Sequence, residues 1–179
     1  LIGAAAARVT RRARAPHAGD ATYMVSVRGV SDSLLARILE SLPSASHPLS
    51  IALRNDTDTH VVSGAPADLA SLVAAIERAA AKDKAAHDAH ERGGRPLSPV
   101  CEYLPVYAPF HSPMLADALE LVDEWALQCG IDASLAHSLA AAVLTTPVDW
   151  PEQIRSATAS GAAWIVDMGL GATTVRMTR

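Results

Sequence analysis

Tyr103-Leu-Pro-Val-Tyr-Ala-Pro-Phe-His-Ser-Pro-Met114 is a strand-like run that ends in a proline-flanked histidine. An amphipathic helix is predicted directly after it, so His111 is expected at a strand-to-helix corner. An imidazole there suits general base catalysis, because its ordinary pKa near 6.5 allows it to take up and return a proton. Considered without its neighbours, His111 favours the interpretation of a partly buried structural residue that is hydrogen-bonded at the end of a strand.

Upstream of this corner the hydrophobic pattern alternates between period two and period three to four, as expected for strands and helices in turn. Ser31 and Asp32 are suitable N-cap residues for a helix that stops at Pro43, and Pro66 fits the first turn of a second helix. Strands are predicted at 23–27, 49–53, 60–63 and 100–107, with a turn at 55–58 and helices at 31–42 and from 66 to the glycines at 93 and 94. This βαββαβ order predicts a ferredoxin-like lobe over residues 21–108.

Downstream of the corner the apolar spacing predicts further helices. The residues from 115 to 129 recur at helical intervals, and Gly130 follows them as a stop signal. Helices are also predicted at 135–144 and 152–160, with a turn at 147–150 and a buried strand at 164–167. Gly169-Leu-Gly171 could cradle a phosphate, but two glycines alone favour a structural turn. Residues 1–8 are typical of the middle of a helix.

Composition excludes several classes of protein. The net charge of -4 and the pI near 5.9 argue against a nucleic-acid surface, which needs clustered Lys and Arg. Two distant cysteines predict neither a disulfide framework nor a zinc site, and no apolar run is long enough to span a bilayer. His87, Asp88, His90 and Glu91 could face a metal from one helix, but a charged, alanine-rich helix end favours a solvated surface. We therefore expect a cytoplasmic protein without a metal.

Four segments together resemble a known enzyme family. Pro109-Phe-His-Ser-Pro-Met-Leu115 resembles the histidine motif of transacylases that move acyl groups from CoA to acyl carrier protein. The other three follow in family order: Asn55 with Val61-Val-Ser-Gly64 and Pro66, then Pro147-Val-Asp-Trp150, then Ile165-Val-Asp-Met-Gly-Leu-Gly171. Over nearly the whole chain this pattern is similar to the acetyltransferase domain of type I fatty acid synthases of the fungal and mycobacterial kind.

The resemblance implies an α/β architecture in which the ferredoxin-like lobe is inserted into a larger, α/β-hydrolase-like catalytic lobe. Residues 1–20 would then end a helix of the large lobe, and residues 109–179 would form its C-terminal part. His111 would be the catalytic base, with its second ring nitrogen held by a backbone carbonyl within 143–146. The acyl group would pass from acetyl-CoA through an acyl-serine to the phosphopantetheine thiol of a carrier protein, with no further cofactor.

The family nucleophile is a serine in a Gly-His-Ser-x-Gly elbow, and no Gly-x-Ser-x-Gly occurs in these 179 residues. Ser63 lacks the flanking glycines of an elbow and is not a credible substitute. We therefore expect the chain to be a piece of a larger polypeptide and unable to form an acyl-enzyme alone. Most relatives also carry an extra strand between the positions of Gly130 and Pro147, for which this chain has no room.

Substrate contacts are expected from two further residues. Asn55 lies where the family places an asparagine at the cleft edge, although it is equally suited to form a turn. Arg8 falls nearest to the arginine that pairs with the malonyl carboxylate in malonyl-specific members, but the alignment can slip to Arg11 or Arg12. The surrounding sequence follows the acetyl-loading type more closely and favours acetyl.

The implied partners are acetyl-CoA, the acyl carrier protein domain and other domains of the same synthase, within a homo-oligomer of the parent. Two alternatives stay open. One is a malonyl transferase of a fatty acid or polyketide synthase, and the other is a non-catalytic scaffold lobe of a multidomain enzyme.

Overall fold

The computed structural model describes residues 1–12, 22–43, 48–90, 93–164 and 166, with residues 11 and 12 described by their backbone only. Its elements are, in chain order, α1 (Ile2–Arg12), β1 (Met24–Arg28), α2 (Asp32–Ser41), β2 (Ser50–Asp56), β3 (Thr59–Ser63), α3 (Pro66–Asp88), β4 (Val100–Tyr103), the short 3-10 helix η1 (Pro113–Leu115), α4 (Asp117–Gln128), α5 (Ala133–Leu144), β5 (Val148–Asp149) and α6 (Trp150–Ala159).

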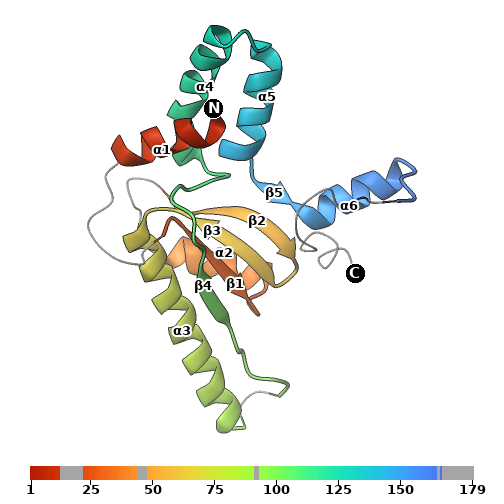
Figure 1. The fold of residues 1–179 in the computed structure, drawn as a ribbon. Coiled ribbons are helices and arrows are strands. Elements are labelled where there is room, and N and C mark those ends of the chain that lie inside the picture. Colours follow the sequence, from red (N-terminus) through yellow and green to blue (C-terminus); the bar gives the residue numbers. More distant parts are fainter. Residues whose placement is uncertain (13–21, 44–47, 91–92, 165, 167–179) are drawn as a thin grey trace.

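The strands form one sheet in the order β4-β1-β3-β2-β5 (Figure 1). The first four are antiparallel to their neighbours, which is the strand order that a βαββαβ chain gives in a ferredoxin-like fold. β5 then joins the free edge of β2 in parallel, with Leu53 opposite Val148 and Arg54 opposite Asp149. The predicted lobe is therefore confirmed in topology and is extended by one strand from the C-terminal part of the chain.

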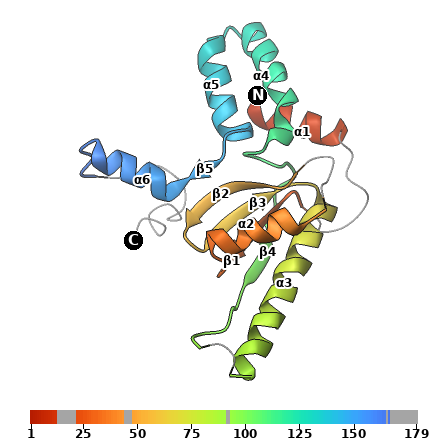
Figure 2. The same cartoon turned by 180° about the vertical axis from the view of Figure 1, so that it is seen from behind.

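Helices α2 and α3 cover the same face of this sheet (Figure 2). Apolar side chains from the strands and both helices are buried between the layers: Val25, Val27, Val30, Leu35, Ile38, Val62, Leu69, Leu72 and Ile76. The helix starts follow the sequence signals, because the Ser31 hydroxyl accepts the Leu34 N–H at 3.4 Å and Pro66 occupies the first turn of α3. The apolar stripes thus predicted this core correctly.

A second core lies beside the sheet and joins both ends of the described chain. Helix α1 packs against α4 and α5, which form a hairpin above the sheet in Figure 1. The buried members are Ala5, Ala6, Ala108, Leu115, Ala118, Val122, Ala126, Ala136, Ala140 and Leu144. Residues before the ferredoxin-like lobe therefore share a core with residues after it, as expected for a lobe inserted into another. The boundaries at 20 and 108 stay predictions.

Several predicted boundaries were wrong. Strand β2 runs to Asp56, so Asn55 lies in the strand and not in a turn, and the chain reverses at Thr57 and Asp58. The ladder with β3 is irregular between Arg54 and Asp56, which lets the strand continue past the expected turn. Strand β4 ends at Tyr103, because Pro105 two residues later has no N–H for a ladder.

The ends of other elements also differ from the prediction. Helix α3 stops at Asp88 rather than at the glycines, with His90 taking a left-handed φ of 58° shortly after the last turn. The segment 147–150 is not a simple turn, since it forms β5 and opens α6. No strand lies between Gly130 and Pro147, as the sequence indicated. The strand predicted at 164–167 and the glycines at 169 and 171 lie outside the described residues, except for Trp164 and Val166.

Within the described ranges, none of the helices combines the length and the apolar character that crossing a bilayer would need.

Candidate active site

His111 lies between the buried Ala108-Pro109 pair and the short helix η1, in contact with the end of α5. Two backbone hydrogen bonds fix this corner to α5. The His111 N–H donates to the Val143 carbonyl at 3.2 Å, and the Ser112 N–H donates to the Leu144 carbonyl at 2.9 Å. Both carbonyls belong to the last turn of a helix, where carbonyl groups lack partners within the helix. The corner therefore completes the hydrogen bonding of α5 while holding its own position.

The imidazole is oriented by a third carbonyl. Nδ1 of His111 lies 2.9 Å from the Thr146 oxygen. A carbonyl oxygen can only accept, so Nδ1 carries the proton and Nε2 presents a lone pair. The side chain is partly exposed, so Nε2 is able to meet a reacting group. This is the arrangement expected of a general base, and the acceptor lies in the predicted segment 143–146.

The backbone of His111 is strained. Its φ of 56° is in the left-handed region, which costs a residue with a Cβ free energy that glycine does not incur. Such conformations persist where surrounding contacts over-determine them, and they cluster at functional sites. Here the contacts with Val143, Leu144 and Thr146 supply that constraint.

This strain gives a stability prediction. His111→Gly is expected to be more stable than His111→Ala by about 1 kcal/mol, because alanine keeps the left-handed penalty while both variants lack the imidazole. Urea unfolding of the two variants measures the difference. At an ordinary α-helical or β position the order would be reversed, so an alanine variant that is the more stable contradicts the left-handed conformation.

The other predicted site residues are not joined to His111 by any hydrogen bond or ion pair within the described part of the chain. Asn55 is partly buried near the end of β2, beyond the two residues that pair with β5. Arg8 is exposed on α1. The side chains of Arg11 and Arg12 lie outside the described residues. Substrate contacts by Asn55 and Arg8 stay predictions.

Sequence reasoning missed a charged cluster beside the site. Arg54 of β2 donates from Nε to Asp32 Oδ1 at 2.9 Å and from Nη1 to Asp149 Oδ2 at 2.7 Å. Asp149 also caps α6, because its Oδ1 accepts the Glu152 N–H at 2.9 Å. Asp149 followed three residues later by Glu152 is a helix-start signal that could have been found, whereas the partners of Arg54 lie 22 and 95 residues away and leave no local pattern.

The charges in this cluster stabilise one another. The pKa of the Asp149 carboxyl is lowered, first by the Glu152 N–H and then by Arg54, while partial burial opposes the shift. The pKa of the Arg54 guanidinium is raised, chiefly by its hydrogen bond to Asp149. All three ionic side chains are more than a third exposed, so their contribution to stability is small.

His60 borders the cluster from β3. Its ring is fully buried, and Nε2 lies 3.0 Å from the Val30 carbonyl, so Nε2 carries a proton. Its Nδ1 is 3.7 Å from Asp32 Oδ1 and has no hydrogen-bond partner among the described residues. Asp32 therefore faces a cation on one side and a buried ring on the other.

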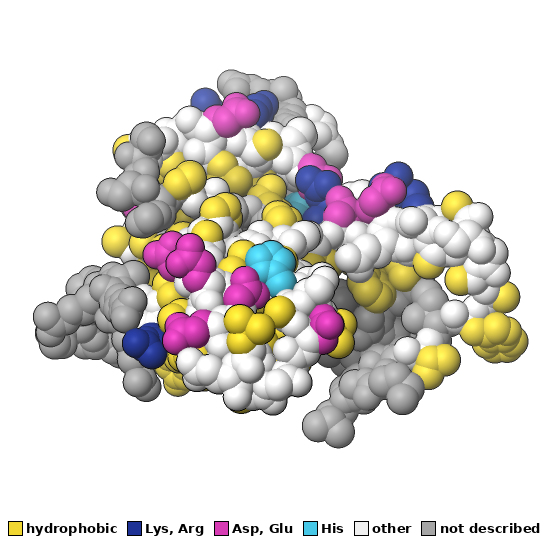
Figure 3. All heavy atoms as spheres, turned by 90° about the horizontal axis from the view of Figure 1, so that it is seen from above, with side chains coloured by type: hydrophobic (Ala, Val, Ile, Leu, Met, Phe, Trp, Pro, Cys, Tyr) yellow, Lys and Arg dark blue, Asp and Glu magenta, His cyan; other side chains and the backbone are white. Residues whose placement is uncertain are grey.

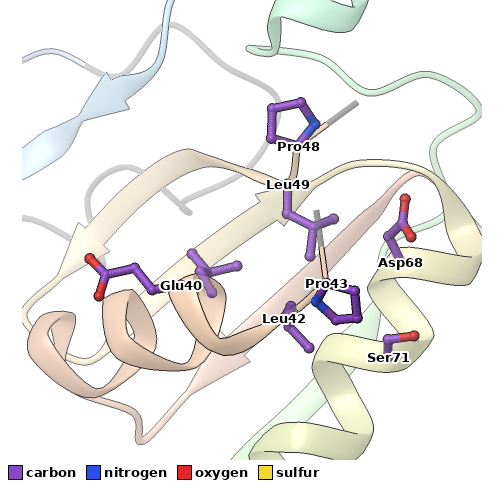
Figure 4. Close-up of a pocket in the computed structure, with 8 residues that line it drawn as sticks. Glu40, Leu42, Pro43, Pro48, Leu49, Asp68 and Ser71 are labelled. Carbon is purple, nitrogen blue, oxygen red and sulfur yellow. The ribbon is translucent and has the colours of Figure 1, made fainter. Parts of the chain in front are cut away.

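A pocket with a cavity volume of about 380 Å³ lies between the end of α2 and the start of α3 (Figure 4). Leucine and proline side chains line it, and Glu40, Asp68 and Ser71 stand at its edge. None of the predicted site residues contributes to it. The candidate site at His111 is instead an open corner of the described structure, and the pocket carries none of its chemistry.

Helix α5 exposes an apolar stripe that ends beside His111. Leu135, Leu139 and Val143 of α5 follow one another at intervals of four residues and are 57%, 54% and 39% exposed, and Ile131, just before the helix, is 42% exposed. The opposite side of α5 is buried against α1 and α4, so the helix has two apolar sides, as in helices that are covered on both sides. Hydrophobic side chains lie open at this end of the molecule (Figure 3). Val143 belongs to both the stripe and the site, because its carbonyl accepts the His111 N–H.

The described residues bring together no group of three or more side chains that could hold a metal ion. The two cysteines are free, and burial raises the pKa of the Cys101 thiol. Glu91 and the segment after Val166 are outside the described residues. The site is thus built from one imidazole, three backbone carbonyls and the neighbouring ionic cluster.

Comparison with known proteins relates the ferredoxin-like lobe to one family. Residues 23–103, which form the whole ferredoxin-like lobe, match the fatty acid synthase central AT domain family. Over 168 residues the chain is also 30% identical to fatty acid synthase subunit beta of Aspergillus oryzae. The alignment covers 76% of the chain and 8% of the fungal protein.

Solved structures show a likeness that extends to residues outside the matched lobe. FabD of Acinetobacter baumannii superposes with a TM-score of 0.65 at 18% identity, over 96% of the chain and 54% of FabD. A malonyl-transacylase in complex with a type II polyketide synthase acyl carrier protein superposes with a TM-score of 0.61 at 18% identity, over 96% of the chain and 54% of that protein. At this identity the likeness shows the fold: the chain spans about half of a malonyl-transacylase-like α/β structure.

Proposed function

We propose that the chain is the histidine-bearing part of an acyltransferase that moves acetyl from acetyl-CoA to an acyl carrier protein of the same synthase. The observation that supports this most directly is the Nδ1 hydrogen bond of His111 to the Thr146 carbonyl. In the neutral ring this bond leaves the lone pair on Nε2, at a corner that the family motif surrounds. The match to the fatty acid synthase AT family and the transacylase-like fold support the same reaction class.

In the proposed reaction His111 acts twice. Nε2 takes the proton of a serine hydroxyl as the serine oxygen attacks the thioester carbonyl, and the resulting imidazolium then protonates the departing CoA thiolate. In the second half, Nε2 takes the proton of the phosphopantetheine thiol, which attacks the acyl-serine, and returns it to the serine oxygen. The Thr146 carbonyl keeps the ring in one orientation and stabilises the imidazolium in both halves.

The serine would come from a segment outside these 179 residues. The apolar stripe on α5 is the surface we expect that part of the catalytic lobe to cover, because the stripe runs to Val143 and so to the edge of His111. A Gly-x-Ser-x-Gly elbow in the parent polypeptide is the sequence feature that would provide the nucleophile.

Acetyl is favoured over malonyl by the sequence around Arg8, which follows the acetyl-loading type more closely. A malonyl carboxylate would need a bidentate arginine, and Arg8, the nearest candidate, lies exposed on α1. The likeness to malonyl-transacylases concerns the fold alone. The experiment must therefore distinguish acetyl transfer from malonyl transfer.

The test is a loading assay on the complete transferase domain with labelled acetyl-CoA and malonyl-CoA in competition. We expect an acetyl-enzyme that is discharged by carrier-protein thiol, and no adduct on the 179-residue chain alone. Preferential malonyl loading would reassign the substrate, and the absence of any acyl-enzyme would support the scaffold alternative. Arg8→Ala serves as the control, because acetyl loading is expected to be unaffected by it.

A further inference from the structure

Arg54 connects three separate parts of the chain. Its guanidinium binds Asp32 at the start of α2 and Asp149 at the junction of β5 and α6, at 2.9 Å and 2.7 Å. Asp32 and Arg54 belong to the ferredoxin-like lobe, whereas Asp149 belongs to the segment that follows α5. The side chain therefore joins the small lobe to the segment that carries the Thr146 carbonyl.

The segment that Arg54 binds pairs with the sheet through a short strand, and α6, which follows it, also contacts β2. Strand β5 consists of two residues only, Val148 and Asp149, opposite Leu53 and Arg54 of β2. Arg54 thus meets Asp149 twice, as its ladder partner and through its side chain. The Asp149 carboxylate uses its other oxygen to cap α6, so both oxygens are committed and the carboxylate is fixed in direction.

Three residues before Asp149, the Thr146 carbonyl accepts from Nδ1 of His111 at 2.9 Å. On its other side this segment is tied to α5, because the Thr146 N–H donates to the Ala141 carbonyl at 2.9 Å. The short segment from Thr146 to Asp149 is therefore held at both ends. Loss of either end would let the carbonyl turn away from the imidazole, which itself sits on a strained backbone.

The charges around Arg54 favour this single arrangement. Asp32 and Asp149 lie on two sides of the guanidinium, His60 is its cross-strand neighbour on β3, and Arg155 of α6 acts on Asp149 from a distance. A guanidinium presents its donors in a rigid planar fork, so it can direct two carboxylates at once. Lysine would keep the charge but not the fork.

We propose that Arg54 is a positioning residue for His111, which fixes the Thr146 carbonyl by binding Asp149 across the β2–β5 junction. This role rests on the proposed function of His111 as a base, but the geometric link can be measured without any transfer reaction. Arg54 touches neither substrate nor the reacting atoms.

The test compares Arg54→Met with Arg28→Met in the 179-residue chain. Arg28 is a matched control, because it pairs with Glu102 at 3.5 Å on β1 and β4, remote from β5 in strand order. Nitrogen NMR of the His111 ring reports which ring nitrogen carries the proton. We expect the Nδ1-protonated form to dominate in the wild type and in Arg28→Met, and a mixture of both forms in Arg54→Met. An unchanged His111 spectrum in folded Arg54→Met would overturn the proposal.

If Arg54→Met does not fold, Asp149→Asn tests the same ion pair from its other side. Asparagine caps a helix as well as aspartate does, so α6 is retained while the ion pair is lost, and the same shift in ring protonation is expected. In the complete transferase, Arg54→Met should lower kcat by about tenfold to a hundredfold with little change in KM, because a small displacement of a catalytic group costs that much. A shift in the NMR spectrum without acyl transfer by the wild type would reject the proposed function and leave the geometric link standing.

Discussion

Replacement of His111 by glutamine in the complete transferase is expected to lower acyl transfer by about 10² to 10⁴-fold, the usual contribution of a positioned general base. Glutamine can still donate from its amide to the Thr146 carbonyl, which His111 Nδ1 contacts at 2.9 Å, but it has no basic atom for the serine proton. Binding of acetyl-CoA should change little. The measurement is the rate of acetyl transfer to carrier protein, with KM and kcat determined separately.

His137→Gln is the matched control for that experiment. His137 is an exposed histidine on α5 that also binds an oxygen acceptor through Nδ1, here Asp123 at 2.9 Å on α4. It lies on the hairpin surface and is not part of the corner at residues 109–112. Its replacement should leave transfer at the wild-type rate. If His111→Gln also transferred at that rate, the assignment of the base would be wrong.

The elements of this fold that the sequence predicted are those with a long periodic signal. The stripe of Leu34, Leu35 and Ile38 placed α2, and the helices α4 and α5 were found from the same spacing. Such patterns are local, because the apolar residues on the buried face of a helix recur every three or four residues. The ferredoxin-like order followed from these elements once the strands between them were counted.

Strand β5 could not be predicted in the same way. Two residues do not make a period, and Val148 pairs with Leu53 only because the chain returns to the edge of β2 after β3, α3, β4 and the α4–α5 hairpin. The extension of β2 through Asn55 likewise depends on its irregular ladder with β3 and not on residue preference. Tertiary pairing overrode the local turn signal at both places.

In the candidate site, too, the features with a local sequence signal were predicted and those that depend on tertiary packing were not. His111 was found from its proline-flanked motif, and the orienting carbonyl was expected within 143–146 from the family resemblance. The left-handed backbone of His111 left no signal, since glycine is the residue that usually marks it. Arg54 and Asp149 were missed because an ion pair over 95 residues appears only when the two lobes are packed together.

Leu144→Ala is expected to lower the free energy of unfolding by about 2–5 kcal/mol, because Leu144 is fully buried in the core that α5 shares with α1 and α4. Leu144 is the last residue of α5, and its own carbonyl and that of Val143 accept from the two backbone N–H groups at the site corner. The cavity should therefore loosen the turn that holds His111. Urea unfolding gives the stability change, and the His111 ring signals report the loosening.

Leu139→Ala is the control on the same helix, with the same atoms removed from a side chain that is 54% exposed. In the 179-residue chain it should change stability by less than about 0.5 kcal/mol, since surface truncations remove little buried area. In the complete transferase the same variant should become destabilising, because the apolar stripe of α5 is expected to be covered there. If Leu139→Ala and Leu144→Ala lowered the free energy of unfolding equally in the isolated chain, α5 would be rotated in solution. If Leu139→Ala had the same effect in the isolated chain and in the complete transferase, the stripe would stay open in both.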